Sequence, residues 1–110
     1  KAVVSSCYFG VQEFRYELDE LSVPSDFQFM DRMSLFKESE LVALICPRPL
    51  EIQAGSRDAA THREMGKRLA PASSAYYEGL GHGDDFRFYV FEGGHEFYDP
   101  SAWDWMQRHL

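Results

Sequence analysis

Two side chains of this sequence have the types and positions that acid–base chemistry needs. Asp58 follows an apolar run in Gly55-Ser56-Arg57-Asp58, and His95 follows another in Gly93-Gly94-His95. A carboxylate beside an imidazole fixes the tautomer of the ring and stabilises its protonated form. The two residues therefore predict an acid and a base that serve a serine nucleophile.

Each residue also has a simpler interpretation when it is taken alone. Asp58 could cap a helix that begins near Thr61, and His95 could be an exposed or hydrogen-bonded loop histidine. The double glycine before His95 could only permit a sharp turn. Both residues follow strand-like runs in the same chain order, however, and this favours the catalytic interpretation over coincidence.

The elements that would position this pair are two strands with a helix between them. Residues 49–54 and 86–91 are predicted strands, and each is followed closely by glycine. Helical spacing begins at Thr61 and continues to residue 80, with Pro71 expected to kink or divide the helix. A right-handed crossover between parallel strands brings the loops that follow them to one edge of the sheet. We therefore expect Asp58 and His95 to lie within hydrogen-bond reach.

The rest of the chain completes an α/β pattern. We expect a first strand at residues 2–8, a long loop at 9–36, a short helix at 39–44 and a final helix opened by Asp99-Pro100. This order predicts parallel strands with flanking helices. Three strands are few for such a sheet, so we expect an incomplete sandwich with an exposed apolar edge.

Composition narrows the possible partners. The chain has 110 residues, a formal charge of -7 and 45% hydrophobic residues, which suits one domain or one piece of a domain. Scattered acidic residues argue against nucleic acid, and no run is apolar enough to span a membrane. Cys7 and Cys46 lie in apolar runs and are expected to be buried free thiols. Because the chain starts at Lys1 on a strand-like run, we expect a longer parent protein and predict no compartment.

Other groups of polar residues give weaker signals. The run His82-Gly83-Asp84-Asp85 lies at the opposite end of the last strand from His95 and Glu96, so a shared metal is not expected and a polar turn is favoured. The glycines of Gly79-x-Gly81-x-Gly83 follow a helix, which is the reverse of a dinucleotide-binding arrangement. We therefore expect neither a metal nor a cofactor.

Two longer runs carry a resemblance to a known family. Residues 44–58 (LICPRPLEIQAGSRD) and 91–97 (FEGGHEF) resemble the C-terminal part of the α/β-hydrolase superfamily. They are most similar to its dienelactone-hydrolase-like and acetyl-xylan-esterase-like branch. The resemblance implies that residues 1–110 are the C-terminal part of one α/β-hydrolase domain, with Asp58 as triad acid and His95 as triad histidine. It also implies an esterase that acts on small-molecule or carbohydrate esters.

One part of the family pattern is missing. The nucleophile elbow Gly-x-Ser-x-Gly does not occur between residues 1 and 110. Ser5, Ser6, Cys7 and Ser56 are the nearest candidates, but none lies between suitably spaced glycines, so we expect them to have packing or turn roles. The oxyanion-hole loop of the family is absent as well. We therefore expect the parent protein to be the enzyme and this chain alone to be inactive.

Three alternatives remain open on the same fold. A serine peptidase of the prolyl-oligopeptidase kind ends with a similar acid and histidine. An enzyme of the dienelactone type would use a cysteine nucleophile instead of a serine. A non-catalytic scaffold or binding protein would keep the fold and lack the elbow altogether.

Overall fold

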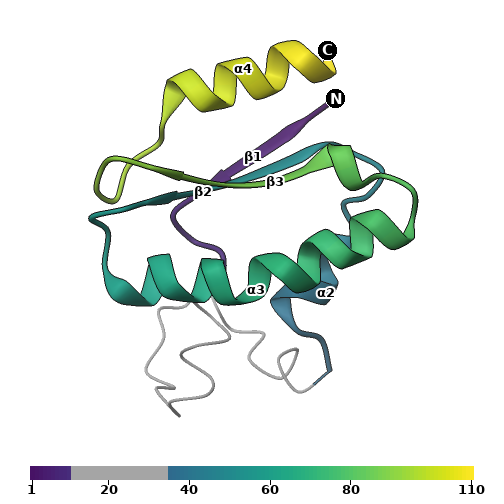
Figure 1. The fold of residues 1–110 in the computed structure, drawn as a ribbon, viewed down its shortest axis with the longest axis horizontal. Coiled ribbons are helices and arrows are strands. Elements are labelled where there is room, and N and C mark those ends of the chain that lie inside the picture. Colours follow the sequence, from purple (N-terminus) through teal and green to yellow (C-terminus); the bar gives the residue numbers. More distant parts are fainter. Residues whose placement is uncertain (11–34) are drawn as a thin grey trace.

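Three parallel strands lie between helices in this small α/β domain, with α2 and α3 on one face of the sheet and α4 on the other (Figure 1). The computed structural model describes residues 1–10 and 35–110. The predicted α/β class is confirmed, whereas the expected loop at 9–36 lies almost wholly outside the described residues. The elements are β1 (Val3–Ser6), α2 (Glu38–Ala43), β2 (Leu50–Gly55), α3 (Ala60–Gly79), η3 (Gly83–Asp85), β3 (Phe86–Phe91) and α4 (Asp99–His109).

The sheet has the order β1-β2-β3, with every pair parallel. All six residues of β2 are buried because this strand is paired on both sides and covered on both faces. Its register with β3 aligns Leu50 with Phe86 and Gly55 with Phe91. The two strands therefore end at the same level, and the loops that follow them leave the sheet side by side.

Helix α3 forms the crossover between β2 and β3 and runs unbroken over 20 residues. The expectation that Pro71 would divide it is wrong. Proline removes one helical hydrogen bond, and Pro71 lies on the exposed side of α3. Leu69 and Tyr77 are buried on the sheet side of the same helix. This packing outweighs the loss of a single backbone bond.

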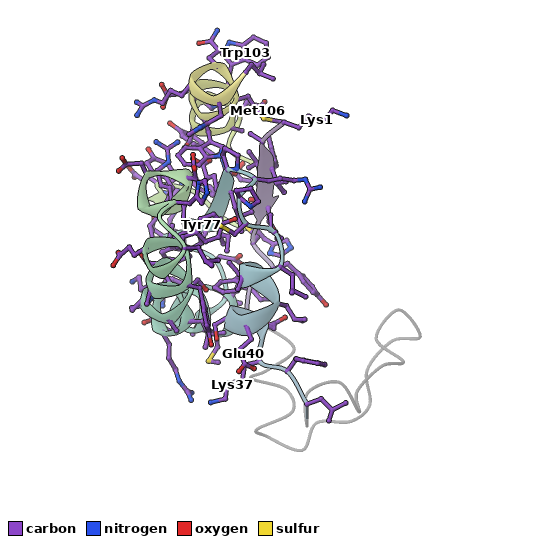
Figure 2. The ribbon with its side chains drawn as sticks, turned by 90° about the vertical axis from the view of Figure 1, so that its right-hand side faces the viewer. Lys1, Lys37, Glu40, Tyr77, Trp103 and Met106 are labelled. Atoms are coloured by element: carbon purple, nitrogen blue, oxygen red, sulfur yellow. The ribbon has the colours of Figure 1, made fainter. Side chains whose placement is uncertain are left out.

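The apolar core lies between the sheet and the two helices on this side. Its fully buried members are Val42, Leu50, Ile52 and Tyr77. The hydroxyl of Tyr77 points into the interior and donates to the carbonyl oxygen of Arg48 at 2.8 Å (Figure 2). Burial raises the pKa of Tyr77 to about 12, and the nearby charges of Cys46 and Asp85 act in the same direction. The phenol is therefore neutral and hydrogen-bonded in the core.

The face of the sheet toward α4 holds a buried polar network. Glu51 is 0% exposed and accepts hydrogen bonds from Arg87 Nε at 2.7 Å and from Ser101 Oγ at 2.9 Å. The guanidinium of Arg87 also lies 4.9 Å from the ring centre of Trp105. Strand alternation turns Glu51 and Gln53 away from the apolar core and toward α4. The network thus joins β2, β3 and α4.

Gln53 anchors the chain just ahead of α4. Its side-chain amide donates to the carbonyl oxygen of Tyr98 at 3.0 Å and accepts from the N–H of Tyr98 at 3.1 Å. The ring of Tyr98 stacks on Phe91, the last residue of β3, with centroids 5.0 Å apart. Both ends of the segment that carries His95 are therefore held against the sheet.

Strand β1 has a hydrogen-bonded partner on one side only within the described part of the chain. An apolar pocket lies on each of its faces. One pocket is lined by Val3, Phe9, Leu41 and their neighbours; the other is lined by Val4 and α4, including Trp103 and Met106, which are labelled in Figure 2. Within residues 1–10 and 35–110, no helix has both the length and the apolar character needed to cross a membrane.

Candidate active site

The structure brings together the two residues that the sequence singled out. Asp58 lies in the loop after β2 and His95 in the loop after β3, and Asp58 Oδ2 is 3.0 Å from His95 Nδ1. The side chain of Asp58 is 4% exposed and that of His95 is 59% exposed. The carboxylate is therefore shielded from water, while the imidazole is accessible from outside.

Backbone contacts between the two loops produce this pairing. The N–H groups of Ser56 and Arg57 donate to the carbonyl oxygens of Phe91 and Gly93, both at 2.8 Å. The loops approach so closely that a Cβ at Gly55 would lie 2.7 Å from the oxygen of Gly93. Position 55 therefore needs glycine because a side chain would collide with the neighbouring loop. A left-handed backbone is not the reason, because the φ angle of Gly55 lies outside that region.

Asp58 accepts three hydrogen bonds from groups on three parts of the chain. Oδ1 accepts from the backbone N–H of Ala59 at 2.7 Å and lies 3.1 Å from His62 Nδ1, and Oδ2 bonds His95. The contact with Ala59 lies next to the start of α3, but the N-cap position of this helix is Ala59 and no side chain caps it, so the expectation that Asp58 caps the helix is wrong.

The hydrogen bonds on Asp58 decide its protonation state. Burial raises the pKa of this carboxyl. The hydrogen bonds from His95, the Ala59 N–H and His62, together with the charge of His62, lower the pKa by a larger amount. The net result is a pKa below the ordinary value of 3.8. Asp58 is therefore ionised near neutral pH and can stabilise a protonated imidazole.

His62 is a site residue that the sequence pattern did not reveal. It lies on the first turn of α3, four residues after Asp58, and its ring centre is 4.8 Å from that of His95. The signal that could have found it is the Asp-x-x-x-His spacing, which places both side chains on one side of a helix start. One carboxylate is thus shared by two histidines.

Replacement of His62 by alanine should raise the pKa of Asp58, because one of its three hydrogen-bond donors and one nearby positive charge are lost. The pKa can be followed through the carboxyl carbon resonance of Asp58. A His82→Ala variant should leave it unchanged, because His82 lies at the far end of β3. An unchanged Asp58 pKa in the His62→Ala variant would contradict the shared-carboxylate geometry.

The same change has a consequence for stability at low pH. A carboxyl whose folded pKa is depressed contributes stability above its unfolded pKa and loses that contribution as the pH falls through the folded value. For Asp58 the loss begins as the pH approaches 3.8 from above and is completed below the lowered folded pKa. His62→Ala should diminish this contribution, which urea unfolding at pH 7 and pH 3 can measure.

The end of β1 supports the loop that carries the histidine. Ser6 Oγ donates to the carbonyl oxygen of Glu96 at 2.8 Å, and Cys7 Sγ donates to the same oxygen at 3.3 Å. Cys7 is buried and has a φ of 61°, which turns the chain sharply out of the strand. Both cysteines are free as predicted, but only Cys7 is buried, and Cys46 is partly exposed.

A pocket of about 350 Å³ opens beside His95. It is lined by Val4, Ser6, Cys7, His95, Glu96 and Phe97. Its walls come from the end of β1 and from the loop after β3. The space is large enough for a small acyl or alkoxy group next to the imidazole.

The second polar group of the sequence forms a separate local structure. His82 Nδ1 lies 2.8 Å from Asp85 Oδ2, and His109 of α4 lies 3.5 Å from the same carboxylate. These residues surround η3 at the start of β3, at the opposite end of the strand from His95. The structure therefore places them in a polar turn, as expected.

Comparison with family models, with curated proteins and with solved structures finds no match to this chain. The functional interpretation consequently depends on the residues and geometry of the site.

Proposed function

We propose that this chain is the acid–base part of an α/β-hydrolase that cleaves carboxylic esters. The observation that supports this most directly is the 3.0 Å contact between a buried Asp58 and an exposed His95 at the carboxyl ends of adjacent parallel strands. This is the position at which open α/β sheets carry their reactive groups. The resemblance of residues 44–58 and 91–97 to the hydrolase family points to the same reaction.

The geometry suits each proton transfer of ester hydrolysis. Asp58 holds the Nδ1–H of His95 and leaves Nε2 free to accept the proton of a serine hydroxyl. The serine oxygen then bonds the acyl carbon, and His95 returns the proton to the departing alkoxide as the ester C–O bond breaks. Water, deprotonated by the same Nε2, then bonds the acyl carbon, and His95 gives the proton to the departing serine oxygen as the acyl–oxygen bond breaks and the acid is released. Asp58 stabilises the imidazolium in both halves of the reaction.

The nucleophile in this proposal lies on polypeptide outside residues 1–110. Two described serines lie near the pair, and both make contacts that hold the loops together. The hydroxyl of Ser6 donates to the Glu96 carbonyl oxygen, and the backbone N–H of Ser56 donates to the Phe91 carbonyl oxygen. The accessible side of His95 is where such a hydroxyl would approach. The proposed substrate class is small-molecule or carbohydrate esters, by analogy with the branch that the sequence resembles.

The proposal is tested by measuring hydrolysis of p-nitrophenyl acetate by this chain alone and by the longer protein that the proposal requires, in which further residues ahead of Lys1 supply the nucleophile. We expect turnover by the longer protein, loss of that turnover in its His95→Ala variant, and no turnover by the chain alone. A matched His82→Ala variant of the longer protein should keep full activity, because His82 lies in the separate polar turn.

Three outcomes would contradict the proposal. Turnover by the chain alone that survives His95→Ala would show that this residue is not the base. Cleavage of a peptide p-nitroanilide without ester hydrolysis would favour the peptidase alternative. A longer protein that is folded and inactive toward both substrates would favour the scaffold.

A further inference from the structure

Three groups that can ligate a divalent metal ion lie close together at the ends of the three strands. They are the thiol of Cys7 after β1, the carboxylate of Asp58 after β2 and the imidazole of His95 after β3. One ligand atom of each lies within 4.8 Å of the other two. We propose that these residues form a binding site for a thiophilic divalent cation, with zinc as the best match.

The separation of the donors supports this proposal. Zinc binds sulfur at about 2.3 Å and nitrogen or oxygen at about 2.0–2.2 Å, so tetrahedral ligand atoms lie about 3.3–3.7 Å apart. The widest pair of donor atoms, at up to 4.8 Å, therefore needs to close by about 1 Å around an ion, whereas Asp58 Oδ2 and His95 Nδ1 are already 3.0 Å apart. His95 can supply much of this movement, because its side chain is 59% exposed and leaves room for a change of rotamer.

The hydrogen bonds around Asp58 and the pocket beside His95 also suit a metal site. Oδ1 of Asp58 is held by the Ala59 N–H and by His62, so Oδ2 is the oxygen that faces His95 and is available to an ion. Outer contacts of this kind orient a ligating carboxylate. The 350 Å³ pocket bordered by Cys7 and His95 leaves a fourth position open to water or another small ligand.

The donor set selects among cations. A thiolate and a carboxylate carry two negative charges, which balance one divalent ion, and the imidazole adds a neutral donor. Magnesium and calcium prefer six or more oxygen ligands, whereas sulfur and imidazole nitrogen favour zinc and cobalt. Binding releases the thiol proton of Cys7 to solvent and replaces its hydrogen bond to the Glu96 carbonyl with a metal–sulfur bond.

Metal binding and base catalysis exclude each other at His95. Coordination through Nε2 occupies the lone pair that accepts a proton. Coordination through Nδ1 breaks the hydrogen bond to Asp58 and leaves Nε2 protonated. Zinc at this site would therefore switch off the base of the proposed hydrolase, although the binding itself does not depend on that function.

The test is titration of the reduced, metal-free 110-residue chain with Co²⁺, followed by absorption spectroscopy. We expect one equivalent to produce a thiolate-to-cobalt charge-transfer band and tetrahedral d–d bands, both displaced by Zn²⁺. Cys7→Ser should abolish the charge-transfer band, and His95→Ala should weaken Co²⁺ binding by at least tenfold. The matched control Cys46→Ser should keep the band, because Cys46 lies away from the strand ends that form the site.

Circular dichroism shows whether each variant is folded. If a variant is not folded, NMR spectra of the unsubstituted chain still test the proposal. Zn²⁺ should shift the imidazole resonances of His95 in NMR spectra and leave those of His82 and His109 in place. Absence of a charge-transfer band in the unsubstituted chain, its persistence in folded Cys7→Ser, or unshifted His95 resonances would each overturn the proposal. None of these outcomes bears on ester hydrolysis, which is measured separately.

Discussion

An Asp58→Asn variant of the proposed hydrolase should hydrolyse p-nitrophenyl acetate with a kcat about ten-thousandfold lower than the unsubstituted protein. The reason lies in the three donors around this side chain. Asparagine has one acceptor oxygen, and the Ala59 N–H and His62 both require it at the position of Oδ1. The amide NH₂ must then face Nδ1 of His95. This stabilises the tautomer with the proton on Nε2, which cannot accept a proton from the nucleophile.

The matched control for this prediction is Asp85→Asn. Asp85 pairs with His82 through a similar contact of 2.8 Å, but at the opposite end of β3. This variant should therefore keep its kcat within a factor of about two. A kcat for Asp58→Asn within tenfold of the unsubstituted enzyme, in a folded protein, would contradict the assignment of Asp58 as the triad acid.

Combining Asp58→Asn with His95→Ala provides a further check. Groups that act as one unit are not additive, so the double variant should be little slower than the slower single variant. Multiplicative losses would indicate that the two side chains act in separate steps. The 3.0 Å contact between them predicts the first result.

The largest effect on stability is expected from Arg87→Met. This substitution leaves the carboxylate of Glu51, which is 0% exposed, without its charged partner. Removing one member of a buried ion pair costs about 3–5 kcal/mol, a large fraction of the 5–15 kcal/mol that stabilises typical domains. Urea unfolding followed by circular dichroism measures the loss, and complete unfolding of the variant would agree with it.

Two controls separate the buried charge from other effects of the substitution. Arg108→Met removes an exposed ion pair with Asp104 and should cost less than about 1 kcal/mol. The double variant Glu51→Gln with Arg87→Met removes both charges and should recover most of the lost free energy. A loss below about 1 kcal/mol for Arg87→Met alone would contradict the role given to this pair.

The strands and the acid–histidine pair could be predicted because their signals are local. The runs 49–54 and 86–91 are apolar or alternating and are followed closely by glycine, so the sequence alone predicts both strands. Parallel pairing through one crossover then required the loops after them to meet. The structure has this topology, with Gly55 opposite Phe91.

Local rules failed where packing decides the result. The expectation that Pro71 would divide the helix was wrong, because Leu69 and Tyr77 pack α3 against the sheet on both sides of that position. The burial of Glu51 could not be predicted from the sequence either, since a glutamate in a strand is normally expected to face solvent. Its partner Arg87 is 36 residues away along the chain.

The sequence by itself determined the fold class and the positions of Asp58 and His95, because hydrophobic period and turn residues act over a few neighbours. Only the tertiary structure decided what surrounds that pair. His62 joins it through the first turn of α3, and Cys7 reaches the His95 loop at Glu96 from 89 residues away. Such contacts depend on strand register and on the path of the crossover. Asp58 therefore emerges as a carboxylate shared by two histidines, beside a buried thiol that the sequence pattern placed in a separate strand.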